Sequence, residues 1–190
     1  MKKTNSARYI TICAMLTALC VVLDRLSAMN EFFKIGLGFV PVVIAAILYG
    51  PATSALFYGL ADFIAANLFP KGAYFPGFTL SAILMGAIYG VFLYEWKKSK
   101  PAFADHGGWL RKVLRYLYRV VAPTLLNSAV GMFLTTYWIT ILSGKSTYWA
   151  NFSLRLTQYA IFIPLNLVLI PALIHLCAKL EKFTAKRVLK

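Results

Sequence analysis

Long apolar segments separated by short polar connections make up most of the chain. A helix needs about 20 apolar residues to cross the hydrocarbon core of a bilayer, and fewer where neighbouring protein shields it. The pattern predicts an all-α integral membrane protein, a single domain over residues 1–190, with six transmembrane helices in one compact bundle. The predicted helices run from Arg8 to Ala28, Ile35 to Tyr49, Ala52 to Phe69, Pro76 to Trp96, Leu117 to Leu142 and Leu154 to Leu180.

Glycine and proline indicate how the predicted helices are joined. Gly50-Pro51 leaves almost no loop between the second and third helices, so these two should form a close hairpin. Pro70 and Gly72 break the chain before the fourth helix. Two further prolines lie inside the last apolar run, where a proline kinks a helix or frees a carbonyl that a neighbour has to satisfy.

Composition supports a membrane location. Strongly apolar residue types make up 60% of the chain, and the mean hydropathy is +0.70, which excludes a soluble domain of this length. The net charge of +14 would suit a nucleic-acid binder, but the basic residues lie between apolar segments and not on one face. We therefore expect the lipid bilayer, and no nucleic acid, as a partner.

The placement of lysine and arginine predicts the topology. Fifteen of the 20 basic residues lie at the N-terminus, in the connection after the fourth helix and in the C-terminal tail. Short cytoplasmic loops carry an excess of positive charge. Both termini are therefore predicted to be cytoplasmic, and the outward connections to be residues 29–34, 70–75 and 143–153.

Three cations on the outward side are candidates for binding an anion. Arg25 lies near the end of the first helix and Arg155 near the start of the last, so both could point into the bundle, where a charge pairs or meets a ligand. A guanidinium suits a carboxylate because it donates two parallel hydrogen bonds. Asp24 is an alternative partner for Arg25, and for Lys71 the alternative is extension toward the lipid headgroups.

Polar and aromatic residues near the outward ends are further candidates for binding. Interhelical hydrogen bonding is the commonest role of polar groups within spans, and a carboxylate there can also form an ion pair. Aromatic residues at a span end form either an interfacial belt or a lid over a planar ring. The polar candidates are Asp62, Asn127 and Gln158, and the aromatic candidates are Tyr74, Phe75 and Phe78.

Sequence patterns argue against an enzyme. Gly144-Lys145-Ser146 resembles the end of a phosphate-binding loop, but Ile139 stands where that loop needs its first glycine. The two histidines, His106 and His175, lack the spacing of a metalloprotease site. The three cysteines lie inside apolar runs, as packing residues do. No catalytic residue, cofactor or metal is expected.

Two blocks of sequence resemble a known family. They are Lys34 to Pro51 and Leu60 to Tyr94, and the specific part is the FP-x-G-x-YFPGFTLSA motif from Phe69 to Ala82. These blocks closely resemble the folate-type substrate-binding (S) components of energy-coupling factor vitamin transporters. Ala14 and Ala18, in the sequence AMLTA on the first helix, resemble the family's AxxxA contact, and small residues at this spacing let two helices approach closely.

The resemblance implies a six-helix protein that binds one vitamin, folate or a reduced folate, from outside the cell. It also implies docking through Ala14 and Ala18 onto a transmembrane coupling subunit driven by two cytosolic ATPases. The pterin ring of folate stacks on aromatic faces and forms hydrogen bonds, and its two glutamate carboxylates pair with cations. Arg155 is our first choice for a cation that binds a carboxylate. The alternatives are an S component for riboflavin or pantothenate, a membrane enzyme, or an assembly subunit without a ligand.

Overall fold

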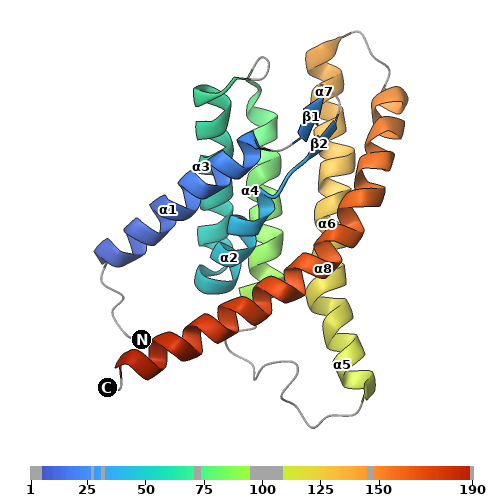
Figure 1. The fold of residues 1–190 in the computed structure, drawn as a ribbon. Helices are drawn as coiled ribbons and strands as arrows, with labels where there is room; N and C mark the ends of the chain where they lie inside the picture. The colour runs from blue at the N-terminus through green and yellow to red at the C-terminus, as the bar shows by residue number, and fades with distance from the viewer. Residues whose placement is uncertain are drawn as a thin grey trace.

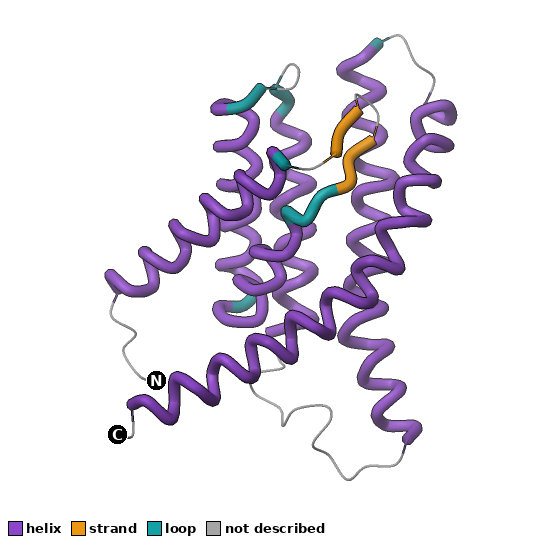
Figure 2. The backbone as a smooth tube through the Cα atoms, in the orientation of Figure 1, coloured by secondary structure: helices purple, strands orange, loops and turns teal. Residues whose placement is uncertain are grey.

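The chain folds into a helical bundle with one small β-hairpin (Figures 1 and 2). A computed structural model describes residues 6–26, 28–30, 33–70, 74–94, 109–144 and 148–188. The helices α1 to α4 and the strands between them come first in the chain. They are α1 (Ser6–Arg25), β1 (Ala28–Asn30), β2 (Phe33–Ile35), α2 (Phe39–Tyr49), α3 (Pro51–Leu68) and α4 (Pro76–Tyr94).

The second half of the chain adds two long helical stretches. The first is continuous and contains two π-helical turns, and the second is a single helix. Their parts are α5 (Trp109–Tyr116), η2 (Leu117–Val121), α6 (Ala122–Ala129), η3 (Val130–Leu134), α7 (Thr135–Ser143) and α8 (Tyr148–Val188). The described residues thus form six helical stretches, which confirms the predicted all-α, six-helix architecture.

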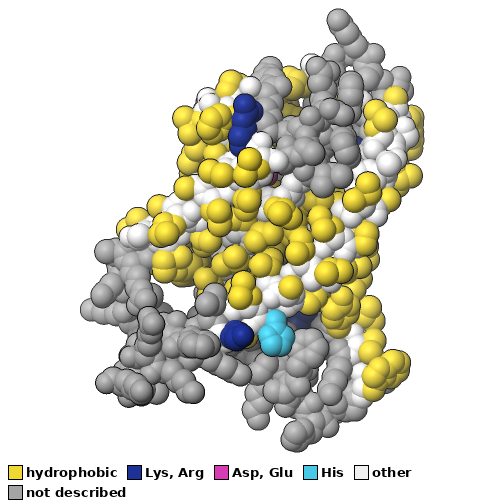
Figure 3. Space-filling model, viewed as in Figure 1, with side chains coloured by type: hydrophobic (Ala, Val, Ile, Leu, Met, Phe, Trp, Pro, Cys, Tyr) yellow, Lys and Arg dark blue, Asp and Glu magenta, His cyan; other side chains and the backbone are white. Residues whose placement is uncertain are grey.

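Three of these stretches are long and apolar enough to cross a membrane: Pro76–Tyr94, Leu117–Leu142 and Tyr148–Lys179. The apolar helix α2 has only 11 residues, and it lies at the centre of the bundle, where α1, α3, α4 and α8 pack around it. Val42, Val43 and Ala46 of α2 are fully buried. Hydrophobic side chains also cover the middle of the face shown in Figure 3, with basic side chains above and below them.

Several predicted boundaries were wrong. The first helix ends at Arg25 instead of Ala28, and the second begins at Phe39 instead of Ile35. Between them, β1 and β2 pair antiparallel, with Met29 opposite Lys34. Strands of three residues are too short to give a period-two pattern, so the predicted connection over residues 29–34 and the adjoining helix ends at Ala28 and Ile35 contained no strand.

The last helix is longer than predicted, because it begins at Tyr148 instead of Leu154 and continues to Val188. Pro164 and Pro171 lie inside it. A proline lacks the N–H that would bond to the carbonyl four residues earlier. For Pro171 that carbonyl belongs to Leu167, and the Tyr116 hydroxyl donates to it at 3.1 Å. A side chain from the neighbouring helix therefore satisfies the backbone group that the proline frees.

The arrangement of the connections agrees with the predicted topology. The β-hairpin, the end of α3 and the start of α8 lie at one end of the bundle, and the α2–α3 turn and the start of α5 lie at the other (Figure 1). Gly50 forms the α2–α3 turn with φ of 90°, a conformation that favours glycine, and Pro51 begins α3. The predicted close hairpin is confirmed.

Close packing of α3 on α4 depends on small residues. The Ser54 hydroxyl of α3 donates to the Gly86 carbonyl of α4 at 2.8 Å. A Cβ at Gly90 would overlap the backbone of Pro51 and the Ser54 hydroxyl, and a Cβ at Gly86 would overlap the Ser54 carbonyl. The two backbones can approach this closely only because both positions are glycine.

Gly90→Ala should destabilise the bundle by about 1–3 kcal/mol, because the added methyl group forces two backbones apart. The measurement is unfolding of the detergent-solubilised protein by titration with sodium dodecyl sulfate. Val91→Ile also adds one carbon, but Val91 is 54% exposed, so this control should change stability by less than about 0.5 kcal/mol. Equal effects of the two substitutions would contradict the packing argument.

Candidate functional site

A stripe of polar side chains runs along the inward face of α8. Asn151, Arg155, Gln158 and Asn166 are separated by three, four or eight residues, so they lie on one side of the helix. Asn151, Gln158 and Asn166 are buried, and Arg155 is partly buried. Toward the other end of α8 the same face becomes apolar. The polar groups therefore occupy the half of α8 that lies nearer the predicted outward side.

Arg155 is held by two contacts inside the bundle. Its Nη1 donates to the backbone carbonyl of Gly131 in η3 at 3.2 Å, and the Tyr159 side chain lies close to its guanidinium. Tyr159 lies one turn further along α8 and is 8% exposed. The structure thus places Arg155 inside the bundle, as expected, and orients its guanidinium.

Asn127 of α6 presents a buried amide close to this group. It is 6% exposed and lies one turn before Gly131 on the same helical stretch. It is next to the Tyr89 hydroxyl of α4, but neither its amide nitrogen nor its amide oxygen has a well-formed hydrogen bond among the described residues. Leaving a buried polar group unpaired costs about 1–3 kcal/mol. This amide is therefore suited to bind a polar ligand.

An aromatic cluster lies where α4 begins and α7 passes beside it. The ring centroids of Phe75 and Trp138 are 5.4 Å apart, and those of Phe75 and Phe78 are 6.2 Å apart. The Trp138 indole N–H donates to the Ser81 hydroxyl at 3.1 Å. A Cβ at Gly77 would lie 2.6 Å from both the Phe75 and the Trp138 rings. These contacts hold the aromatic planes in defined orientations, as stacking on a flat ligand requires.

Asp62 and Tyr74 belong to a separate hydrogen-bonded group. The Thr79 hydroxyl of α4 donates to Asp62 Oδ2 of α3 at 2.8 Å, and the hydroxyls of Tyr74 and Thr79 are 3.1 Å apart. The Tyr74 ring also packs edge-on against Phe63, with centroids 5.7 Å apart. Asp62 therefore makes an interhelical hydrogen bond, which is the structural alternative to ligand binding that its position within a span suggested.

The other two candidate cations differ from Arg155. Arg25 is exposed, and its guanidinium carbon lies 5.4 Å from the centroid of the Phe69 ring. It does not point into the bundle, contrary to one expectation from its position. Lys71 lies outside the described residues. Among the described residues, no group of three or more His, Cys, Asp or Glu side chains could hold a metal ion.

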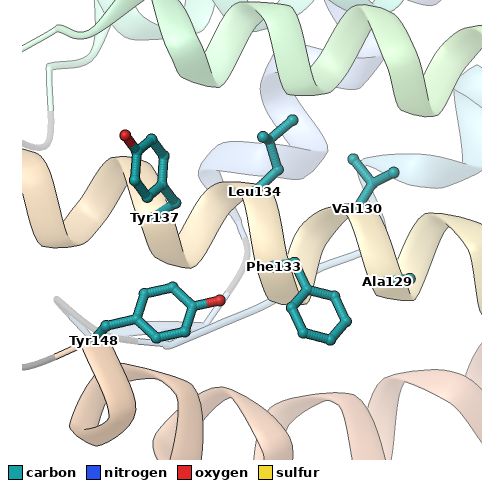
Figure 4. A pocket seen from close by; sticks show the side chains of 6 residues that line it. All are labelled: Ala129, Val130, Phe133, Leu134, Tyr137 and Tyr148. Atoms are coloured by element: carbon teal, nitrogen blue, oxygen red, sulfur yellow. The ribbon is translucent and has the colours of Figure 1, made fainter.

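A separate apolar groove of about 560 Å³ lies on the outside of η3 and α7. Figure 4 shows its lining, with Tyr148 at the start of α8 facing Phe133 of η3. Phe133 is 58% exposed and Tyr137 51% exposed. The lining has no charged residue, so this groove does not suit an anionic ligand. It consists of Ala129, Val130, Phe133, Leu134, Tyr137 and Tyr148.

Three residues of the site were missed by the sequence analysis: Trp138, Tyr159 and Tyr89. Tyr159 follows Arg155 by four residues, so helical spacing from Arg155 would have found it. No comparable signal marks Tyr89 or Trp138, because aromatic residues are common throughout membrane spans. The structure thus brings Arg155 and Gln158 onto the face of α8 that meets the stretch carrying Asn127.

Comparison with known proteins finds similarity along most of the chain. A family model described as "ECF transporter, substrate-specific component" matches residues 8–175. A folate transporter, FolT, of Clostridium novyi (strain NT) is 35% identical over 170 residues, which are 90% of this chain and 88% of that protein. A folate transporter, FolT, of Leuconostoc mesenteroides subsp. mesenteroides is 28% identical over 164 residues, which are 86% and 79% of the two chains.

A solved structure is similar as well. The crystal structure of FolT bound with folic acid has a TM-score of 0.68 and 31% sequence identity. The similarity covers 85% of this chain and 88% of that chain.

Thr79→Val should destabilise the protein by about 1–3 kcal/mol, because it removes the hydroxyl that donates to Asp62 and meets Tyr74. The measurement is the same unfolding titration in detergent. Thr79→Ser keeps the hydroxyl and should keep most of the stability. If the valine and serine variants were equally stable, the link between α3 and α4 would contribute nothing.

Proposed function

Because the chain belongs to the substrate-specific components of energy-coupling factor transporters, we propose that it captures folate from outside the cell and delivers it through an ATPase-driven coupling module. It is a multi-pass membrane protein and a non-enzymatic substrate-binding subunit. Folate is proposed as the substrate because the chain is similar over nearly its whole length to folate transporters. The similar solved structure also contains folic acid.

Arg155 is proposed to bind a carboxylate of the glutamate part of folate. A guanidinium has five N–H donors, and a bidentate carboxylate takes two of them. The contacts with Gly131 and Tyr159 orient the group and leave donors for a ligand. Arg25, exposed at the outward end of α1, and Lys71 are proposed to attract the dianion by their charge.

The pterin ring is proposed to lie between the aromatic cluster and the polar groups of α6 and α8. Phe75, Phe78 and Trp138 offer ring faces at the outward end of α4 and α7. Asn127 and Gln158 offer amide groups, which can pair with the donors and acceptors on a pterin edge. Tyr74 is proposed to border this site, while Asp62 holds the ends of α3 and α4 together through Thr79.

An S component for riboflavin or pantothenate would have the same fold but different side chains in its ligand-binding pocket. Riboflavin lacks the two carboxylates of folate, so it would make no use of an inward-facing arginine held ready for an anion. Pantothenate has a carboxylate but no flat ring for the cluster of Phe75 and Trp138. The site thus favours folate over both alternatives.

The coupling partner is proposed to dock on α1. Ala14 and Ala18 are both exposed in the structure, on a face of α1 that also exposes Met15 and Val22. A small-residue face in a membrane lets a partner helix approach closely. We propose that this partner is a transmembrane coupling subunit, itself bound to two cytosolic ATPases.

Arg155→Ala should weaken folate binding by about 10- to 100-fold, because a charge-assisted hydrogen bond contributes about 1.5–3 kcal/mol. The measurement is calorimetric titration of the purified protein with folate, and with riboflavin and pantothenate for comparison. Lys179→Ala removes the same charge from an exposed position near the other end of α8 and should leave binding unchanged.

Trp138 supplies an optical check on the same titration. Trp138 lies in the aromatic cluster, whereas Trp109 and Trp149 are 77% and 71% exposed. A fluorescence change on adding folate should disappear in Trp138→Phe and persist in Trp109→Phe. Saturable binding of riboflavin or pantothenate instead of folate would overturn the choice of substrate. An unchanged affinity in Arg155→Ala would overturn the role of Arg155.

The double substitution of Ala14→Leu and Ala18→Leu should abolish uptake of folate and leave binding intact, because bulky side chains keep the partner helix away. The measurement is folate uptake by cells that contain the coupling subunit and ATPases, alongside titration of the purified variant. Ala160→Leu makes the same change at an exposed position of α8 and is the control. Normal uptake by the double variant would show that the partner docks elsewhere.

A further inference from the structure

The π-helical turn η3 changes which face of its helix is buried. Up to Gly131, the second residue of η3, buried residues recur every three or four positions, through Thr124, Asn127 and Gly131. The next buried residue is Thr136, five positions after Gly131. A π turn contains an additional residue, so the face that points inward shifts at this turn. Gly131 is the last inward residue before the shift.

Gly131 makes two contacts with the group around Arg155. Its carbonyl accepts the hydrogen bond from Arg155 Nη1 at 3.2 Å. Its missing side chain leaves the space that Tyr159 occupies: a Cβ at position 131 would overlap the Tyr159 hydroxyl and lie 2.8 Å from Tyr159 Cζ. The added Cβ would also lie 3.0 Å from Met85 Cε of α4, so the space beside Gly131 is filled on that side as well.

We propose that Gly131 is a positioning residue that orients Arg155 for a ligand carboxylate. The carbonyl of Gly131 fixes one edge of the guanidinium, and the missing side chain of Gly131 admits the Tyr159 hydroxyl to the place beside it. Any side chain at position 131 displaces Tyr159 and thereby turns Arg155 away from the ligand. The inference rests on the proposed function, because it concerns how the folate carboxylate is recognised.

Fixing the guanidinium in advance also lowers the cost of binding. An arginine side chain that is free to rotate loses conformational entropy when it binds, and a side chain already held by two contacts loses less. Gly131 therefore acts on affinity for the carboxylate and not on contacts with the pterin ring. This difference separates a positioning role from a role in helix packing alone.

The test compares two ligands, folate and a folate diamide whose two carboxylates are replaced by neutral amides. Gly131→Ala should weaken binding of folate by about tenfold or more and change the affinity for the diamide much less. Val130→Ile, which adds one carbon at the neighbouring position of η3, is the control and should change neither affinity.

A double-mutant cycle with Arg155→Ala identifies the residue through which Gly131 acts. If Gly131 positions Arg155, then Gly131→Ala should have little further effect on folate binding once Arg155 is alanine. Adding Tyr159→Phe to Gly131→Ala should restore part of the affinity, because it removes the hydroxyl that meets the new methyl group. Equal and additive losses for both ligands would overturn the proposal.

Tyr159→Phe alone keeps the proposal testable if Gly131→Ala does not fold. It retains the glycine and removes one of the two contacts with Arg155, so it should weaken binding of folate more than binding of the diamide. An equal effect on both ligands would overturn the inference. Absence of folate binding by the unaltered protein would instead overturn the proposed function.

Discussion

Backbone groups within a membrane have no water to bond to, and this constraint governs the structure. Helices satisfy most of these groups internally, and neighbouring side chains satisfy those that irregularities expose. The Tyr116 hydroxyl bonds to the Leu167 carbonyl freed by Pro171. The contact of Arg155 with the Gly131 carbonyl in η3 is of the same kind. The residue proposed to bind the ligand therefore also takes part in satisfying the backbone of its neighbour.

The polar groups of the site follow from the same constraint. Polar side chains are costly inside a membrane protein, so a buried set of them indicates either structure or function. Asp62 belongs to the first kind, since Thr79 binds it across the α3–α4 contact. Asn127 belongs to the second kind in our proposal, since its buried amide has no well-formed hydrogen bond among the described residues. Hydrogen-bond partners, and not residue type, distinguish a structural polar side chain from one available to a ligand.

Hydropathy and charge placement were sufficient to predict six helices, their order and the end of the bundle at which each connection lies. Both signals depend on composition over many residues, which tolerates local irregularity. No sequence signal indicated the β-hairpin, whose strands are three residues long, or the π-helical turn η3. Position along the chain allowed both Arg25 and Arg155 to point inward, because the rotation of a helix about its axis decides which side chain does so. The spacing of Asn151, Arg155, Gln158 and Asn166 did contain that information for α8.

The short helix α2 has a consequence for how the protein is made. Eleven residues span about 16 Å, roughly half of the hydrocarbon core, so α2 alone is a weak signal for insertion into the bilayer. It is joined to α3 by the single turn at Gly50-Pro51 and is covered by four other helices. We therefore expect α2 to enter the bilayer together with α3. The centre of the bundle forms only when α8, which follows α1 to α7 in the chain, closes over α2, so the final packing of the core comes after the synthesis of α8.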